Sequence, residues 1–270
     1  MTCDASLYLE LLKNSLTASL YESDSVEPVG GLHGFLARLL FDTFGKANRK
    51  LVRLRPFDLQ SRQEGREWPR WAHTMVGLKR LDNLQSCLES VLARQVPGDF
   101  IETGVWRGGA SIFMRAVLKA HGVADRRVWV ADSFAGLPPP DAARYPQDAE
   151  SLLHKANFLA VSVEEVRANF ARYNLLDDQV IFLKGWFRET LPPLRDRKWA
   201  LIRLDGDLYE STTDGLVNLY PNLSPGGYLI VDDYGAVAAC RQAVEDYRHA
   251  QGILEPIQRI DWTGVFWQRE

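Results

Sequence analysis

Cysteine is scarce in this sequence, and the cysteines that occur form no pattern. Cys3, Cys87 and Cys240 are far apart along the chain, and no two of them have the C-x-x-C spacing. An odd and scattered set excludes a disulfide framework and a cysteine-based zinc site. A chain that uses neither suits a reducing compartment, so we expect a cytoplasmic protein.

Long apolar runs and an excess of one charge are missing as well. No stretch approaches the ~20 apolar residues of a membrane span, and the N-terminus lacks a basic region followed by an apolar core. We therefore expect neither membrane insertion nor export. The 32 Lys and Arg residues are scattered and are balanced by 35 Asp and Glu residues, which disfavours nucleic acid as a partner.

What the sequence does contain is a change of hydrophobic pattern near residue 97. Before it, apolar residues recur with helical spacing over 6–20, 34–50 and 78–92, and no convincing strand is present. After it, short apolar runs alternate with helical patterns, which is typical of a parallel sheet. The strands are expected near 99–104, 128–132, 179–183, 199–205 and 227–232, and the helices near 109–121, 163–173, 211–220 and 236–250.

The last two apolar segments, 256–261 and 264–268, are joined by a tight turn and must run antiparallel. We predict an α/β fold with a Rossmann-like, doubly wound and mostly parallel sheet that ends in this hairpin. Residues 1–96 are expected to form a helical extension and lid, and residues 97–270 the ligand-binding domain, within one structural unit. Two S-x-x-acid boxes predict helix starts at Ser162 and Ser211.

The segment 101–111 has the pattern of a strand, a glycine turn and a helix. Its glycines follow the spacing Glu102-x-Gly104-x-x-x-Gly108, which differs from the G-x-G-x-x-G of dinucleotide enzymes. This spacing resembles the loop of S-adenosylmethionine methyltransferases. We expect the missing Cβ atoms of Gly104 and Gly108 to let the backbone approach the methionine and ribose of that cofactor.

Acidic residues stand at the ends of four predicted strands. Ligands of open α/β sheets bind beyond the carboxyl ends of the strands, so these positions favour function over chance. Asp132 is placed to accept from two ribose hydroxyls. Asp205, Asp232 and Asp233 follow neighbouring strands, and converging carboxylates with no His or Cys select Mg²⁺. The alternative is that Asp232-Asp233 is a turn pair whose side chains face opposite ways and that Asp207 or Asp205 caps the helix that follows.

Five blocks carry a resemblance to a known family, and together they span most of the chain: 71–84, 102–111, 204–211, 231–234 and 262–267. They resemble the macrocin and mycinamicin type of macrolide-sugar O-methyltransferases. The resemblance implies S-adenosylmethionine as donor, Mg²⁺ as cofactor, a sugar hydroxyl of a small-molecule glycoside as acceptor, and a homo-oligomer, dimer or tetramer. It also implies Asp205, Asp232 and Asp233 as the metal ligands. Aminocoumarin deoxysugar O-methyltransferases share these blocks, so the acceptor is not identified.

The site residues expected from pattern and resemblance together fall into groups by role. His73, Thr74 and Met75 would frame the cofactor, Asp205 would be the catalytic base, and the loops 22–34 and 138–157 would act as lids. His73 or His154 is the alternative base. The remaining cofactor-binding residues are Glu102, Thr103, Gly104 and Ser111 on the methionine side, Asp132 and Ser133 at the ribose, and Gly185 and Trp186 at the adenine.

Three other functions compete with this prediction. An NAD-dependent oxidoreductase would share the fold, but the glycine spacing and the closing hairpin argue against it. A catechol or caffeoyl-type methyltransferase would use the same metal chemistry on an aromatic diol. A non-catalytic cofactor-binding protein would have lost the metal carboxylates, whereas this chain retains all three.

Overall fold

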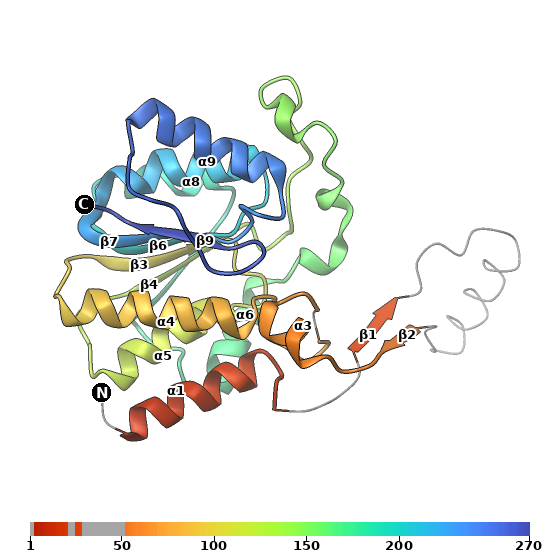
Figure 1. Ribbon diagram of the computed structural model, residues 1–270, viewed down its shortest axis with the longest axis vertical. Coiled ribbons are helices and arrows are strands. Elements are labelled where there is room, and N and C mark those ends of the chain that lie inside the picture. Colours follow the sequence, from red (N-terminus) through yellow and green to blue (C-terminus); the bar gives the residue numbers. More distant parts are fainter. Residues whose placement is uncertain (1–2, 21–24, 29–51, 68) are drawn as a thin grey trace, which may run out of the picture.

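The computed structural model of the chain describes residues 3–20, 25–28, 52–67 and 69–270. Its centre is a seven-stranded sheet with the strand order β5-β4-β3-β6-β7-β9-β8 (Figure 1). The first five strands in this order run parallel, β9 is antiparallel to β7, and β8 is antiparallel to β9. Their bounds are β3 (Asp99–Thr103), β4 (Val128–Asp132), β5 (Val180–Lys184), β6 (Trp199–Leu204), β7 (Leu223–Val231), β8 (Gln258–Arg259) and β9 (Val265–Gln268).

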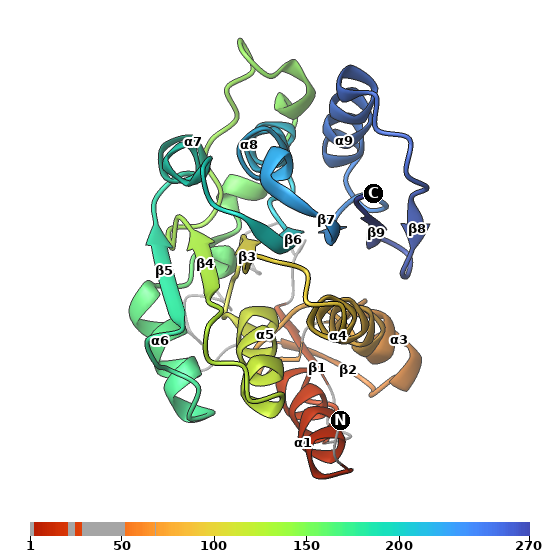
Figure 2. The same cartoon turned by 90° about the vertical axis from the view of Figure 1, so that its left-hand side faces the viewer.

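Helices cover both faces of the sheet (Figure 2). One face is covered by α1 (Cys3–Leu16), α4 (Leu78–Ala93), α5 (Gly109–Ala120) and α6 (Val163–Arg172). The other face is covered by α7 (Phe187–Thr190), α8 (Tyr209–Leu219) and α9 (Ala238–Gln251). This arrangement confirms the predicted doubly wound α/β fold, including its antiparallel end.

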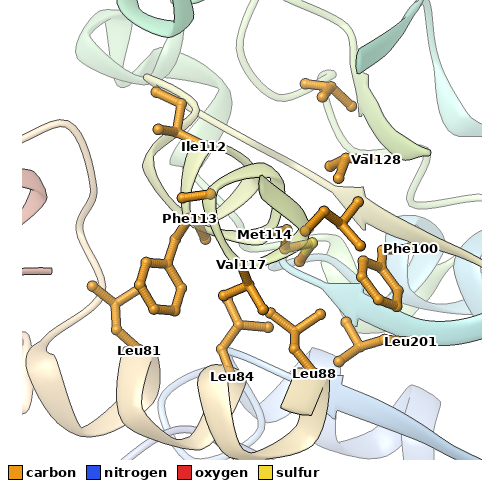
Figure 3. Close-up of a cluster of buried hydrophobic side chains, with 14 of the residues drawn as sticks. Leu81, Leu84, Leu88, Phe100, Ile112, Phe113, Met114, Val117, Val128 and Leu201 are labelled. Atoms are coloured by element: carbon orange, nitrogen blue, oxygen red, sulfur yellow. The ribbon is translucent and has the colours of Figure 1, made fainter. Parts of the chain in front are cut away.

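Alternation along the strands builds a separate core on each face. Phe100 of β3 lies in the core between the sheet and α4 and α5, beside Leu201 of β6 and near Leu88 of α4 (Figure 3). The next residue, Ile101, lies in the core beneath α8 and α9. Successive side chains of a strand point to opposite faces, so a buried parallel strand reads as a continuous apolar run. Helices α1 and α4 share their core with α5, so the N-terminal extension packs as part of the same unit.

The N-terminal part differs from expectation in one respect. β1 (Ser25–Pro28) and β2 (Val52–Arg55) form an antiparallel pair, so the prediction that this part lacks strands was wrong. Each strand has only four residues, too few for an alternating pattern to stand out. A short helix, α3 (Leu59–Glu64), lies between the predicted helices over 34–50 and 78–92, where no element was predicted. The predicted helix over 34–50 and most of the loop 22–34 lie outside the described residues.

One of the two predicted helix starts is confirmed. The Ser162 hydroxyl accepts a hydrogen bond from the Glu165 amide at 3.2 Å and begins α6. Helix α8 instead begins at Tyr209, two residues before Ser211. Its first amides donate to the carboxylate of Asp148, a residue distant in sequence. Among the described helices, none is both long and apolar enough to cross a bilayer.

Candidate active site

A cavity of about 370 Å³ opens at the carboxyl ends of the parallel strands. This volume is in the range of small-molecule sites. Loops that follow β3, β4, β5, β6 and β7 all contribute to it, as does the segment before α4. Of the predicted site residues, those that line the cavity are Thr74, Met75, Glu102, Gly104, Asp132, Ser133, Gly185, Trp186, Asp205, Asp232 and Asp233.

The glycine loop has its conformation for packing reasons that the sequence could not reveal. Gly104 has φ +82°, and a Cβ there would lie 1.6 Å from the main-chain oxygen of Asp205. Gly108 has φ +87°, and its Cβ would meet the Val166 side chain at 2.8 Å. Gly104 does line the cavity. Gly108 is not among the lining residues, and the close packing of α5 on α6 already accounts for a glycine there.

Three predicted cofactor residues lie outside the cavity lining formed by the described residues. Thr103 and Ser111 are fully buried, and the Ser111 hydroxyl donates to the Glu102 carboxylate. The His73 ring turns away, and its Nδ1 pairs with the Tyr173 hydroxyl at 2.7 Å. Burial, and then Arg172 and Arg107, lower the pKa of His73. The main-chain oxygen of His73 instead accepts a hydrogen bond from the Gly109 amide, at the start of α5, at 2.9 Å.

Asp132 joins two loops of the site. Its carboxylate accepts from the Val105 amide at 2.8 Å and from the Phe134 amide at 2.7 Å. Burial raises its pKa, although these two bonds act in the opposite direction. Each carboxylate oxygen has a second lone pair, so the cavity side of Asp132 is still able to accept from a ligand. The residue therefore fixes the loop geometry in addition to the role predicted for it.

Two buried arginines, which the sequence analysis did not single out, organise the acidic residues. Arg203 in β6 donates to Glu102 at 2.6 Å, to Asp205 at 2.7 Å, and to Asp232. Arg80 in α4 donates to the other oxygen of Asp232. One signal for Arg203 was available, since a charge inside the apolar run of a buried strand requires a partner. Arg80 lies in a helix with an exposed face, so its position in the sequence did not indicate a buried partner.

Carboxylates of Asp205, Asp232 and Asp233 converge, and one oxygen from each lies within 4.8 Å of the others. Burial and the neighbouring carboxylates raise the pKa of Asp205 to about 6 and that of Asp233 well above its usual range. Asp207 beside them has a pKa raised to about 7, chiefly by burial. Such a cluster is unfavourable unless a cation or protons neutralise it. The hard oxygen donors fit Mg²⁺.

Comparison with known proteins decides the family. A family model described as Macrocin-O-methyltransferase (TylF) matches residues 5–269. The chain belongs to this family. It is 56% identical over 270 residues, covering 99% of the chain and 95% of the relative, to the 8-demethyl-8-(2,3-dimethoxy-alpha-L-rhamnosyl)-tetracenomycin-C 4'-O-methyltransferase of Streptomyces olivaceus.

Two further relatives agree. The chain is 46% identical over 266 residues to the mycinamicin III 3''-O-methyltransferase of Micromonospora griseorubida, covering 97% of the chain and 96% of the relative. The solved structure of the O-methyltransferase NovP superposes with a TM-score of 0.85 at 47% identity, covering 98% of this chain and 99% of that one. The predicted family and the O-methyltransferase class are confirmed, and the NAD-dependent alternative was wrong.

In this macrocin-type O-methyltransferase, the segment 138–159 covers one side of the cavity. Leu153, Phe158 and Leu159 of this segment line it, and the Phe158 main-chain oxygen accepts from the Trp106 indole at 2.9 Å. The segment overlaps the lid predicted over 138–157. His154 is not among the lining residues. Of the three residues considered as the base, Asp205 lines the cavity, and His73 and His154 are not among its lining residues.

Proposed function

We propose that this O-methyltransferase, as a homo-oligomer, transfers the methyl group of S-adenosylmethionine to a sugar hydroxyl of a glycosylated natural product and requires Mg²⁺. The observation that carries the proposal is the convergence of Asp205, Asp232 and Asp233 beside the glycine loop. The names of the relatives support a sugar acceptor, because the tetracenomycin relative methylates a rhamnosyl group.

The residues that line the cavity fit S-adenosylmethionine and Mg²⁺. Thr74 and Met75 would contact the methionine part of the donor together with Gly104, Asp132 would accept from the ribose, and Trp186 would cover the adenine. Asp205, Asp232 and Asp233 would hold the ion. When bound, the donor supplies an activated methyl group and the ion lowers the pKa of acceptor hydroxyls.

We assign to Asp205 the role of the base that accepts the proton of the acceptor hydroxyl. Arg203 donates to its Oδ2, whereas no donor among the described residues reaches its Oδ1. That oxygen would thus be the one available to take the proton of the acceptor hydroxyl, and the electron pair of the broken sulfur–methyl bond would stay with the donor sulfur. The residues that contact the donor would orient it toward the acceptor. The apolar side chains of Leu153, Phe158 and Leu159 would exclude water from the cavity.

The proposal is tested by a methyl-transfer assay with labelled S-adenosylmethionine. The acceptors are a 2,3-dimethoxy-rhamnosyl tetracenomycin, demethyldecarbamoylnovobiocin, mycinamicin III and a catechol. We expect transfer to at least one glycoside and none to the catechol, and we expect chelation of divalent ions to remove the activity and added Mg²⁺ to restore it. Full activity in chelator would refute the metal requirement, and transfer to the catechol alone would refute the sugar acceptor.

The contact between α5 and the segment 73–75 gives a further prediction. A Cβ on Gly109 would lie 2.5 Å from the His73 main-chain oxygen and 2.6 Å from the Thr74 Cβ. Gly109→Ala should therefore displace Thr74 and Met75 and weaken S-adenosylhomocysteine binding roughly tenfold in calorimetry. Gly122→Ala is the control: a Cβ there meets no atom within 4 Å, and at φ +66° the substitution strains only the backbone just after α5. Equal affinity of the two variants for S-adenosylhomocysteine would contradict the proposal that the segment 73–75 contacts the donor.

A further inference from the structure

The segment between β4 and α6 contains a buried carboxylate that the proposed reaction leaves without a role. Asp148 is 2% exposed, although the residues around it, from 141 to 150, are otherwise exposed or only partly buried. It ends the short 3₁₀ turn Pro146–Asp148. A buried carboxylate is costly unless it is hydrogen-bonded, so its partners indicate what it does.

The partners of Asp148 are the first amides of α8. Oδ1 accepts from the Tyr209 amide at 2.7 Å, and Oδ2 accepts from the Glu210 amide at 3.0 Å. The residue in the N-cap position of α8 is Leu208, which makes no side-chain cap. The lid therefore supplies the cap that the helix itself lacks, and its negative charge lies at the positive end of an 11-residue helix. The ring of Tyr145 packs against Tyr209 beside this contact.

The capped turn leads directly into the acidic cluster. Asp205, Gly206 and Asp207 connect β6 to α8, and the Asp207 amide donates to Asp233 at 3.2 Å. Asp207 has φ +57°, a conformation that costs energy for a non-glycine residue and persists only when its surroundings impose it. The position of the first turn of α8 thus constrains both Asp205 and Asp233.

The same segment is attached to the opposite side of the cavity at its other end. Phe158 accepts from Trp106 in the glycine loop, as described above. Figures 1 and 2 both place this segment, in green, beside α8. One covering segment therefore joins the loop after β3 to the helix after β6, with the lining residues Leu153 and Leu159 near its second attachment.

We propose that Asp148 is a positioning residue that latches the segment 138–159 to α8 and so holds Asp205 in its catalytic geometry when the cavity is covered. The role of Asp205 in this statement rests on the proposed function. The latch itself rests on the two amide contacts. It makes covering of the cavity and placement of Asp205 one coupled event instead of two independent ones.

Hydrogen exchange read by mass spectrometry tests the latch without any turnover. In Asp148→Ala, the amides of Tyr209 and Glu210 should exchange roughly tenfold faster than in wild type, the change that loss of about 1.4 kcal/mol of capping produces. The strands β3 to β7 should be unaffected. Glu150→Ala is the control, because it removes an exposed acid from the same segment. Unchanged exchange at the two amides would overturn the latch.

Coupling is tested by adding S-adenosylhomocysteine. In wild type, the ligand should slow exchange both in the glycine loop and over 138–159, whereas in Asp148→Ala protection should remain in the glycine loop and be lost from 138–159. Equal protection of 138–159 in both proteins would overturn the coupling. If Asp148→Ala does not fold, Asp148→Asn replaces it, because it keeps one accepting oxygen and removes the other.

Activity separates a positioning role from a merely structural one. Asp148→Ala should lower kcat more than it raises KM for the acceptor, with a melting temperature only a few degrees lower, and Asp148→Asn should recover part of kcat. A kcat equal to wild type would overturn the positioning role. If the wild-type protein methylates no acceptor at all, the proposed function fails, and the exchange experiment still decides the latch.

Discussion

Asp205→Asn should lower kcat by roughly a thousandfold or more, because it removes the proposed base and one of the three converging carboxylates. The substitution keeps the shape of the side chain. Arg203 retains Glu102 and Asp232 as partners, so the fold should persist. Steady-state methyl transfer measures the loss, and calorimetry should find S-adenosylhomocysteine affinity within about threefold of wild type.

The matched control is Asp207→Asn, which makes the same change two residues away. Asp207 is outside the group of three carboxylates that converge, and burial raises its pKa, so removing its charge should disturb the site less. We expect a much smaller loss of kcat. If the two variants lose activity equally, general disturbance of the β6–α8 loop explains the loss, and the role of Asp205 as base is refuted.

Much of the sheet was predictable because each element carries a local pattern. The buried runs of β3, β4 and β6 are mainly apolar, and the acids that were singled out lie at or next to their carboxyl ends. Parallel strands bring their carboxyl ends to one edge, so Asp132, Asp205 and Asp232 could be placed at the site from order alone. Asp205, Asp232 and Asp233 were expected to converge for the same reason, and their carboxylates do lie together.

The features that were missed depend on contacts between distant residues. The cap of α8 comes from Asp148, 61 residues earlier than Tyr209. The local S-x-x-acid pattern at Ser211 therefore predicted the wrong start for this helix. The rotation of His73 toward Tyr173 depends on a contact across 100 residues. Neither spacing nor residue type records such a partner, since a side chain of the same type points into the cavity or away from it according to the packing of its backbone.

Arg203→Met should produce the largest loss of stability, roughly 3–5 kcal/mol in urea unfolding. Arg203 is 2% exposed and lies between Glu102, Asp205 and Asp232. Methionine fills a similar volume but leaves these carboxylates without their shared counter-charge in a desolvated place. The control is Arg66→Met, which breaks the partly exposed pair of Arg66 and Glu64 and removes the Arg66 guanidinium from the Trp262 ring, and which should cost at most about 2 kcal/mol.

The loss in Arg203→Met should also depend on pH. Burial already raises the pKa of Glu102 to about 7 in the folded protein, against an ordinary value of 4.5, and Arg203 acts to lower it. Without Arg203 this pKa rises further, so folded Glu102 binds a proton over a wider range. A group whose pKa is raised by folding favours the folded state at low pH, and this contribution disappears as the pH rises through the folded pKa. Relative to wild type, Arg203→Met should therefore be less destabilised at pH 6 than at pH 8, and the opposite order would show that Glu102 is not the carboxylate left without its partner.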